Sequence, residues 1–471
     1  MKSVRKSGPV LPVYVHEPSL IAQPDVSRQH QCFVQETLEE LSADIESIGG
    51  SLTQLCGEAV EAFKKLHAVS PITRIWAHQE TTQNAQFERD NAVRAWCRDN
   101  GVELMEIEQN GIVRGAQEKE PFPDYFARSV ATEIRNPMGK DLSARFAKPP
   151  IPSVDKADIP VASGEDKPKR QRGGRKAAEA LMDKFFQIGS LKAYPRKISS
   201  PNTADGVSRL STYMAYGIVS DRELFHRVDQ LVTQAHGKME EQEFEKFQSN
   251  ARFYLDRLSW RRDYIQTFEE QPRLETETML PEFADLRSDE FDQEAFERWK
   301  AGRTGFPYVD AAMRSLNATG WLNMRLRATA VSFATMNLWI PTTEVARHLA
   351  REFLDYSPGV HHVINQVIAG TTSFERLMLF DPVKQGVDHD PDGKFVRTWV
   401  PELADLYGPA AHQPELTANR LSSKAGDMAP YPRAIVDHKA TAKIARRRIK
   451  DARDGTKTSS DGSSLNQSSL F

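Results

Sequence analysis

A guanidinium and a carboxylate occupy positions from which they could form a buried ion pair. Apolar residues at three- and four-residue steps predict a helix over residues 322–339, on which Arg327 shares a face with Asn323. The next apolar pattern predicts a helix with Asp355 in its last turn, where the helix dipole disfavours a carboxylate by up to about 1 kcal/mol. Such a carboxylate is either solvated, the commoner case, or paired with a cation. Arg327 is the candidate partner, whereas Arg325 lies off that face.

Generic motifs for phosphate and metal binding fail on inspection. The chain contains neither G-x-x-x-x-G-K-[ST] nor G-x-G-x-x-G. Residues 388–393 open like a calcium loop, but Trp399 stands where the bidentate Glu is required, so we expect a turn there. The adjacent His361 and His362 cannot both point into one helical site, and no carboxylate or cysteine stands at ligand spacing. We therefore expect no metal site.

Composition bounds the class of protein. Of the 471 residues, 39% are hydrophobic and 27% charged, which excludes wholesale disorder. The 62 Lys and Arg against 65 Asp and Glu give a net charge of −3, so a polyanion would have to meet a local basic patch. No run approaches the roughly eighteen apolar residues of a membrane span, and the basic amino terminus lacks a secretory core. The 3 cysteines cannot form a disulfide framework. We predict a soluble, cytoplasmic protein.

The elements that must position these side chains fall into two domains. Residues 1–136 alternate short apolar runs with helical patterns, which predicts parallel βαβ units and a doubly wound α/β sheet. The expected strands are 10–15, 52–56, 72–77 and 102–107, and the expected helices are 31–48, 59–67 and 87–100.

Beyond that domain the composition changes. Residues 137–175 are rich in proline and read as a linker, which closes with a basic run, Lys167–Arg172. We expect that run to be solvated; one side of a nucleic-acid surface is the alternative. Residues 176–455 read as a large all-helical domain, and residues 456–471, mainly Ser, Thr, Gly and Asp, are expected to be disordered.

Three long motifs carry a family resemblance. They are Trp299-Lys-Ala-Gly-Arg-Thr-Gly-Phe-Pro-Tyr-Val-Asp-Ala-Ala-Met-Arg314, Thr319-Gly-Trp-Leu-Asn-Met-Arg-Leu-Arg327 and Asp388-His-Asp-Pro-Asp-Gly-Lys-Phe-Val-Arg-Thr-Trp-Val-Pro-Glu-Leu403. Together they resemble the flavin-binding helical domain of the photolyase–cryptochrome family, in a divergent bacterial branch. Val207-Ser-Arg-Leu-Ser211 is similar to the family's serine-rich loop for the flavin diphosphate. The resemblance covers nearly the whole chain.

The resemblance implies a U-shaped FAD held among helices. It places Tyr194 and the 208–211 loop on the diphosphate side, Arg261 along the flavin, and an ion pair of Arg327 with Asp355 beside the flavin ring. The implied cofactor-binding residues are Tyr194, Ser208, Arg209, Leu210, Ser211, Arg261, Asn323, Met324, Arg327, Asp355, Ser357 and His361.

The resemblance also implies an activity. Light would excite reduced FAD, and an electron would split a cyclobutane pyrimidine dimer in UV-damaged DNA, bound by a protein that is expected to be a monomer. Arg257, Trp260 and His361 are the implied catalytic residues; Trp260 would stack on the extruded lesion, which returns about 1–3 kcal/mol. Arg252, Arg262 and the run 446–448 are candidates for phosphate contacts, although that run could equally be the solvated face of a terminal helix.

This sequence departs from the family pattern at several positions, and these departures weaken the inference of a repair activity from the resemblance. The family's first strand has no counterpart, which would leave two open edges in the middle of the sheet and leaves the antenna chromophore undecided. We expect a start codon upstream of Met1, with a damaged antenna domain as the alternative. Arg257 stands where many repair enzymes have a lesion-contacting glutamate, and a guanidinium cannot accept hydrogen bonds.

The flavin surroundings depart as well. Asn323-Met324 replaces the histidine pair of enzymes that repair (6-4) photoproducts, which argues against that substrate. His361 aligns with the asparagine near flavin N5 and could tune the flavin by protonation, or be a core histidine. The three photoreducing tryptophans align with Asp289, Thr342 and Asn365, so photoreduction must use another route or be slow. A cryptochrome-like photoreceptor without repair, or an inactive flavin-binding relic, are the alternative functions.

Overall fold

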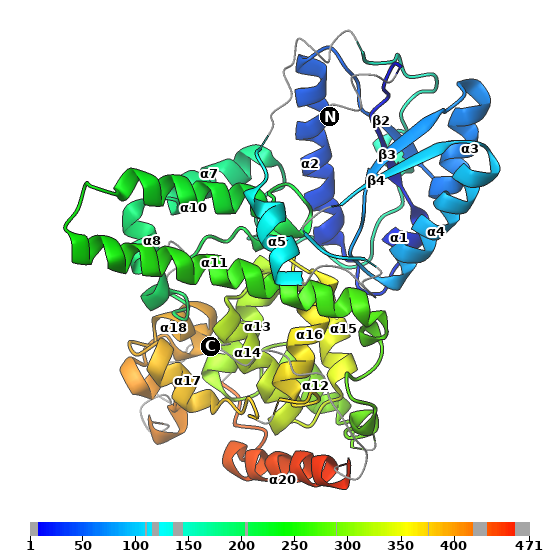
Figure 1. Cartoon of the computed structure of the whole chain (residues 1–471). Coiled ribbons are helices and arrows are strands. Elements are labelled where there is room, and N and C mark those ends of the chain that lie inside the picture. The colour runs from blue at the N-terminus through cyan, green and yellow to red at the C-terminus, as the bar shows by residue number, and fades with distance from the viewer. Residues whose placement is uncertain are drawn as a thin grey trace.

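The computed structural model describes residues 8–108, 111–114, 122–134, 145–202, 206–288, 290–374, 376–417 and 431–456. An amino-terminal domain of strands and helices stands beside a larger body of helices, and the terminal helix lies at the far end of that body (Figure 1). Two expectations fall outside these ranges: the alignment of Asp289, and disorder of the tail beyond residue 456.

The strands of the amino-terminal domain form two separate parallel pairs rather than one sheet. They are β1 (Val13–His16), β2 (Thr53–Cys56), β3 (Arg74–His78) and β4 (Glu103–Ile107). β1 pairs with β2 from Val13↔Thr53 to His16↔Cys56, and β3 pairs with β4. No described strand joins the two pairs. The expected open edges are thus present, and the doubly wound sheet is divided in two.

Helices connect and cover these strands, as parallel pairing requires. They are α1 (Pro18–Ile21), α2 (Arg28–Ser47), α3 (Ala59–Val69), α4 (Asn84–Asp99) and α5 (Phe122–Ala131). The amino terminus of α2 is closed by a capping box, in which the Ser27 amide donates to Nδ1 of His30 (3.1 Å). The Ser27 hydroxyl then donates to the carbonyl of Arg351 (2.8 Å), which ties α2 to the helical domain.

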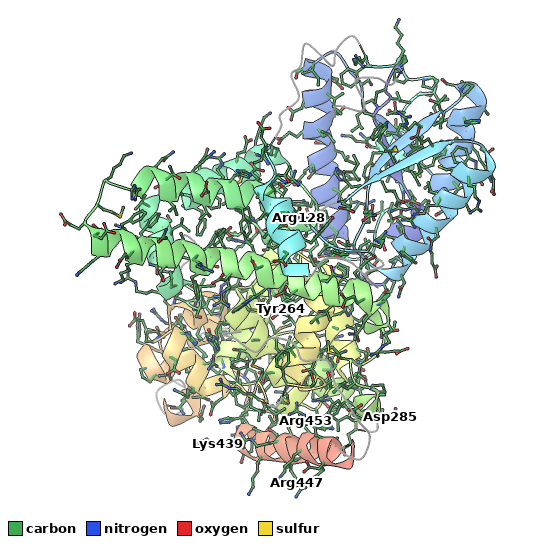
Figure 2. The ribbon with its side chains drawn as sticks, viewed as in Figure 1. Arg128, Tyr264, Asp285, Lys439, Arg447 and Arg453 are labelled. Carbon is green, nitrogen blue, oxygen red and sulfur yellow. The ribbon has the colours of Figure 1, made fainter. Side chains whose placement is uncertain are left out.

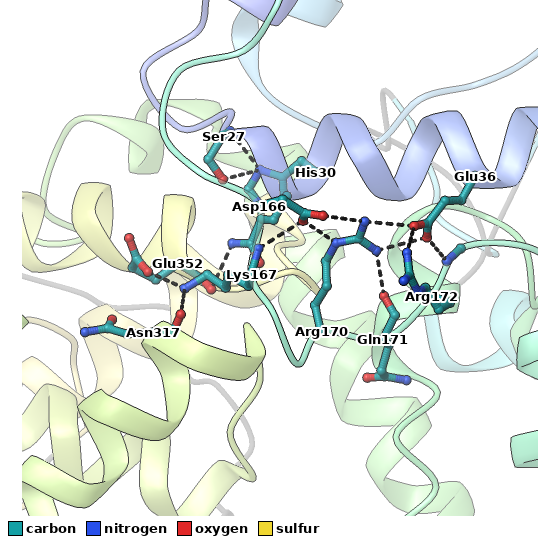
Figure 3. Close-up of polar contacts among 12 residues, drawn as sticks. Ser27, His30, Glu36, Asp166, Lys167, Arg170, Gln171, Arg172, Asn317 and Glu352 are labelled. Atoms are coloured by element: carbon teal, nitrogen blue, oxygen red, sulfur yellow. Dashed lines mark hydrogen bonds and ion pairs between the residues drawn. The ribbon is translucent and has the colours of Figure 1, made fainter. Parts of the chain in front are cut away.

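The basic run Lys167–Arg172 is part of the interface between the two domains, so the prediction of a solvated run was wrong for its inward residues. Arg170, with 3% of its side chain exposed, pairs with Glu36 on α2 and with Asp166 (Figure 3). Lys167 pairs with Glu352 and donates to the carbonyl of Leu316 (2.9 Å). Carboxylates from both domains therefore compensate charges that the local sequence leaves unpaired.

The helical domain contains two large apolar clusters, one built mainly from residues 296–411 and the other mainly from residues 178–258. Its helices are α7 (Arg175–Phe185), α8 (Ile188–Lys197), α9 (Ser211–Ala215), α10 (Asp221–Ala235), α11 (Glu241–Glu270), α12 (Gln293–Lys300), α13 (Pro307–Thr319), α14 (Met324–Ser332), α15 (Thr342–Glu352), α16 (Pro358–Ala369), α17 (Pro382–His389), α18 (Lys394–Trp399) and α20 (His438–Thr456). α11 runs across the face that meets the amino-terminal domain (Figure 1).

The helix predicted over residues 322–339 begins slightly later than predicted and changes its geometry before the predicted end. Gly320 ends α13 with φ +67°, and the Asn323 side chain then accepts from the amide of Leu326 (2.9 Å), so α14 begins at Met324. Residues Phe333–Asn337 continue it as a π-helix. In the described chain, no helix is long and apolar enough to cross a membrane, and no cluster of three or more His, Cys, Asp or Glu could hold a metal ion.

Candidate functional site

Two neighbouring cavities meet at the segment between α15 and α16. The smaller, about 30 Å³, is lined by Met324, Arg327, Val331, Phe353, Asp355, Tyr356, Ser357, Val360, His361, Ile364, Asn365 and Ile368. The larger, about 730 Å³, lies between the domains, along β1, α2, the start of α4 and residues 214–217. Tyr356 and Ser357 line both cavities and therefore form the partition between them.

The expected ion pair is present at the wall of the smaller cavity. Nη2 of Arg327 lies 2.6 Å from Oδ1 and 2.5 Å from Oδ2 of Asp355, whose side chain is 3% exposed. Nε of Arg327 donates to the carbonyl of Leu322 (2.9 Å), and its guanidinium lies 3.9 Å from the ring centre of Phe353. The pair thus has a fixed geometry with little solvent around it.

The prediction that Asp355 lies in the last helical turn was wrong. α15 ends at Glu352, because Phe353 adopts an extended backbone (φ −86°, ψ 114°). Asp355 therefore stands in the connection to α16, whose first residue is Pro358. Burial, rather than the helix dipole, is therefore what disfavours the charge of Asp355. Arg327 compensates for this burial.

His361 is a neutral core histidine, so a role through protonation is not supported. Its Nε2 lies 2.8 Å from the carbonyl of Ala346, which requires an N–H there. Burial lowers the pKa of His361 to about 4. The pKa of the adjacent His362 falls to about 3, again because of burial, and its ring stacks on Phe268. Both rings are packed on one turn of α16 and bind no common group.

The loop before α9 holds an unusual arginine. Arg209 has a left-handed backbone (φ +52°), a conformation in which a non-glycine residue is strained. Its guanidinium lies 4.7 Å from the ring centre of Trp321, whose Nε1 donates to Oγ of Ser211 (3.2 Å). The buried Nε of Arg209 has no hydrogen-bond partner among the described residues. Burial lowers the pKa of Arg209, while the charge of Asp355 opposes that shift. An anion bound here could accept a hydrogen bond from this buried N–H.

The aromatic ring expected to receive a lesion is already in contact with a cation. The guanidinium of Arg257 lies 4.3 Å from the ring centre of Phe253 and 3.9 Å from that of Trp260. All three residues are on α11, at spacings of four and three that place them on one face. A base could stack on Trp260 only after this guanidinium is displaced or shared.

Two further arginines of α11 behave differently from each other. Arg261 lines the larger cavity, with Nη1 3.9 Å from Oδ2 of Asp221. Arg262 is fully buried and its Nη2 donates to the same oxygen (2.5 Å). The proposed phosphate contact of Arg262 was therefore wrong, whereas the neighbouring Arg252 is exposed.

The basic run at 446–448 belongs to the solvated face of α20, at the far end of the helical domain (Figures 1 and 2). Arg446 and Arg447 are exposed, while Arg448 makes two contacts with the carboxylate of Glu290 (2.7 and 2.8 Å). Ala445 and Ile449, on the opposite face, are buried against the domain.

The structure brings together only part of the predicted set. The smaller cavity collects Met324, Arg327, Asp355, Ser357 and His361; Arg261 and Ser357 meet the larger one. The remaining predicted residues line neither: Tyr194, Ser208, Arg209, Leu210, Ser211, Arg257, Trp260 and Asn323. Leu210 is fully buried, and Tyr194 packs edge-on against Phe185. Sequence reasoning missed Tyr356, because nothing in its spacing marked it apart from its neighbours.

Comparisons with known proteins cover both domains. Residues 254–451 match the family described as the FAD binding domain of DNA photolyase, and residues 1–127 match DNA photolyase. A deoxyribodipyrimidine photo-lyase of Escherichia coli is 30% identical over 400 residues, covering 81% of this chain and 79% of the relative. One from Streptomyces griseus is 28% identical, covering 88% of each, and a cryptochrome DASH of Gloeobacter violaceus is 27% identical, covering 86% and 82%.

Solved structures share the fold. A class III photolyase of Agrobacterium tumefaciens superposes with a TM-score of 0.75 at 23% identity, covering 96% of this chain and 94% of the other. A Synechocystis cryptochrome superposes with a TM-score of 0.78 at 21% identity, covering 93% of each. The matches in sequence extend over the Arg327–Asp355 site as well as the divided sheet. This chain belongs to the photolyase/cryptochrome family.

Proposed function

We propose that the smaller cavity and its surroundings bind FAD. The donor set fits such a group: Arg209 offers a buried, unpartnered N–H suited to a diphosphate, and Arg327 offers a cation beside the apolar wall of Val331 and Ile364. The space of about 30 Å³ is far too small for a dinucleotide. Binding of a dinucleotide therefore requires the partition of Tyr356 and Ser357 to turn aside and join the two cavities.

The function proposed for the loaded protein is light-dependent repair of cyclobutane pyrimidine dimers in UV-damaged DNA, by a monomer. Reduced FAD, once bound, supplies under light the electron that splits the dimer. The chain's residues bind and orient: Arg327 holds negative charge near the flavin ring, Asp355 fixes that guanidinium, and Trp260 offers a stacking surface. The observation that carries the proposal is the buried Arg327–Asp355 pair in a chain that matches both photolyase domains.

A photoreceptor without repair activity is the second candidate, and one residue favours it. Arg257 covers the face of Trp260 and can accept no hydrogen bond from a lesion. Relatives named cryptochrome DASH, such as that of Gloeobacter violaceus, are about as similar to this chain as the photo-lyases are.

A repair assay separates the two candidates. Purified protein, reduced with dithionite, is mixed with an oligonucleotide that carries one cyclobutane thymine dimer and is illuminated with blue light. We expect restoration of thymine absorbance in the light and none in the dark. Arg257→Ala, which uncovers Trp260, is the companion variant: if neither protein repairs while the bound flavin still photoreduces, the receptor function replaces repair. A folded protein that carries no flavin would contradict both candidates.

A further inference from the structure

The outer face of α20 carries a stripe of positive charge about 16 Å long. Five exposed cations follow one another at steps of three and four residues, and we call them the α20 stripe: Lys439, Lys443, Arg446, Arg447 and Lys450. Between His438 and Lys450 the helix contains no Asp or Glu. Within the described part of the chain, no carboxylate forms an ion pair with the last four of these cations.

The helix that carries the stripe is fixed to the helical domain by its inner face. Ala445 and Ile449 are buried in an apolar cluster with Trp339. Nη2 of Arg453 donates to the carbonyl of Gly370 (3.2 Å), which follows the last residue of α16. Figure 2 shows Arg453 turned toward the domain and Arg447 directed away from it. The stripe is therefore displayed to solvent on a rigid support.

The chemistry of the stripe favours a phosphate backbone over a lipid surface. A helix that binds a membrane needs an apolar face for the acyl chains, and the apolar face of α20 is already buried against the domain. Ile444, 43% exposed, is the one large apolar side chain that α20 exposes in the described structure. Duplex DNA carries one negative charge for about every 1.7 Å of its axis, so a stripe of this length faces several phosphates at once.

The stripe lies apart from the proposed cofactor and lesion sites. Among the described residues, none from α20 lines either cavity. Trp260 is on α11, which runs along the face that meets the amino-terminal domain, whereas α20 lies at the far end of the helical domain (Figure 1). A nucleic acid bound to α20 therefore leaves both cavities free. Since the net charge of the chain is −3, attraction of a polyanion to this end depends on the local patch.

We propose that the α20 stripe binds the phosphate backbone of undamaged double-stranded DNA, as a contact separate from the lesion site. The choice of DNA among polyphosphates rests on the proposed function. The contact selects no base sequence, because its cations pair with phosphate oxygens and not with base edges. It holds the protein on DNA whether or not a lesion is present.

The test removes three charges from the centre of the stripe in the full-length chain: Lys443→Gln, Arg446→Gln and Arg447→Gln together. Binding to a fluorescein-labelled undamaged duplex is measured by anisotropy between about 50 and 200 mM salt. We expect the triple variant to bind about tenfold or more weakly than the wild type. The slope of log K against log salt concentration should become shallower by about two to three, because fewer counterions are released.

The matched control removes three exposed cations from the amino-terminal domain: Lys64→Gln, Lys65→Gln and Arg98→Gln together. Both triple variants change the net charge equally, and their melting temperatures are measured to show that they fold. We expect the control to keep its duplex affinity within about twofold of the wild type. Equal loss of affinity in both variants, or no loss in the α20 variant, overturns the proposal.

Two further measurements separate the alternatives. Vesicles of phosphatidylcholine and phosphatidylserine are the competing polyanion: if the α20 variant loses vesicle binding and keeps its duplex affinity, a lipid surface replaces DNA. The α20 variant, reduced with dithionite, should repair a saturating single-stranded oligonucleotide with one dimer as fast as the wild type. A wild type that binds the undamaged duplex through the stripe and repairs nothing contradicts the proposed function alone.

Discussion

The walls of the two cavities carry charge in different ways. In the helical domain, Arg327 and Asp355 form one closed pair at a small apolar cavity, and the imidazoles of His361 and His362 beside it are neutral. The amino-terminal side of the larger cavity instead collects carboxylates, among them Glu17 and Asp25. Burial raises the pKa of both, and for Glu17 the nearby charge of Arg89 does not reverse the shift.

The two domains also differ in the size of their apolar cores. The helical domain has two large clusters, one of which runs through α13, α14 and α18, whereas the amino-terminal domain has two small clusters, one for each strand pair. Two-stranded pairs contribute little stability alone. The comparison places the Arg327–Asp355 pair in the half with the larger cores, while the amino-terminal half is joined to that half by α2 and the basic run.

The largest expected effect tests the closed pair. Arg327→Ala leaves the buried Asp355 without its cation, which costs about 3–5 kcal/mol of unfolding free energy for such a pair. It also removes the cation proposed to face the flavin ring. We expect the variant to elute without flavin from gel filtration, by absorbance, and to unfold at lower urea concentration.

Arg325→Ala is the matched control, two residues away on the same helix. Its guanidinium lies 5.5 Å from the ring centre of Phe380 and does not line the smaller cavity. We expect this variant to retain flavin and to lose less than about 1 kcal/mol. Equal flavin loss in the two variants would contradict the proposal that the ion pair is part of the cofactor site.

The next largest effect is a difference between the two domains in how their stability depends on pH. The pKa of His361 is lowered to about 4 and that of His362 to about 3, so their contribution to stability is full above the unfolded value of 6.5 and is lost as the pH falls towards 4. At pH 5 each costs about 2 kcal/mol relative to pH 7. The raised pKa values of Glu17 and Asp25 have the opposite sign: their contribution is full below the unfolded value and is lost as the pH rises through the folded one.

Amide hydrogen exchange at pH 7 and pH 5, corrected for intrinsic rates, measures this difference by region. We expect α16 to lose protection at pH 5 while β1 keeps its own. His30 on α2 should follow α16, because its Nε2 contacts the carbonyl of Phe353 and burial lowers its pKa to about 4. A parallel loss of protection in β1 and α16 would show that the two halves do not differ in this way.

Local patterns predicted the elements well and the long-range contacts poorly. The region expected to be all-helical forms α7 to α20, and the four expected strands appear within a few residues of their predicted bounds. The partnership of Arg327 with Asp355 could be suggested because both lie in one motif-rich segment. The contact of Ser27 with Arg351 could not, since it joins distant segments across a domain interface. The burial of Lys167 and Arg170 was missed for the same reason. The local sequence of a basic run gives its own charges, but it does not reveal the carboxylates from distant segments that pair with them.

The smallest expected effect tests that interface. Hydrogen bonds from Arg170, the Gly173 amide and Arg172 outweigh burial and bring the pKa of Glu36 down to about 2. Arg170→Ala leaves Glu36 and Asp166 partly buried without their shared cation. Because both carboxylates keep some contact with solvent, the loss should be about 1–2 kcal/mol, below that of a fully buried pair.

The control for that variant is Arg172→Ala, which removes a second partner of the same carboxylate from a position that is 78% exposed. We expect its unfolding free energy to change by less than about 0.5 kcal/mol, and its urea transition to stay single. Arg170→Ala should instead spread the transition, with fluorescence of Trp96, in the amino-terminal core, changing before that of Trp299 in the helical core. Equal midpoints and one shared transition in both variants would mean that the buried arginine does not couple the two halves, and that the contacts of α2 with the helical domain join them without it.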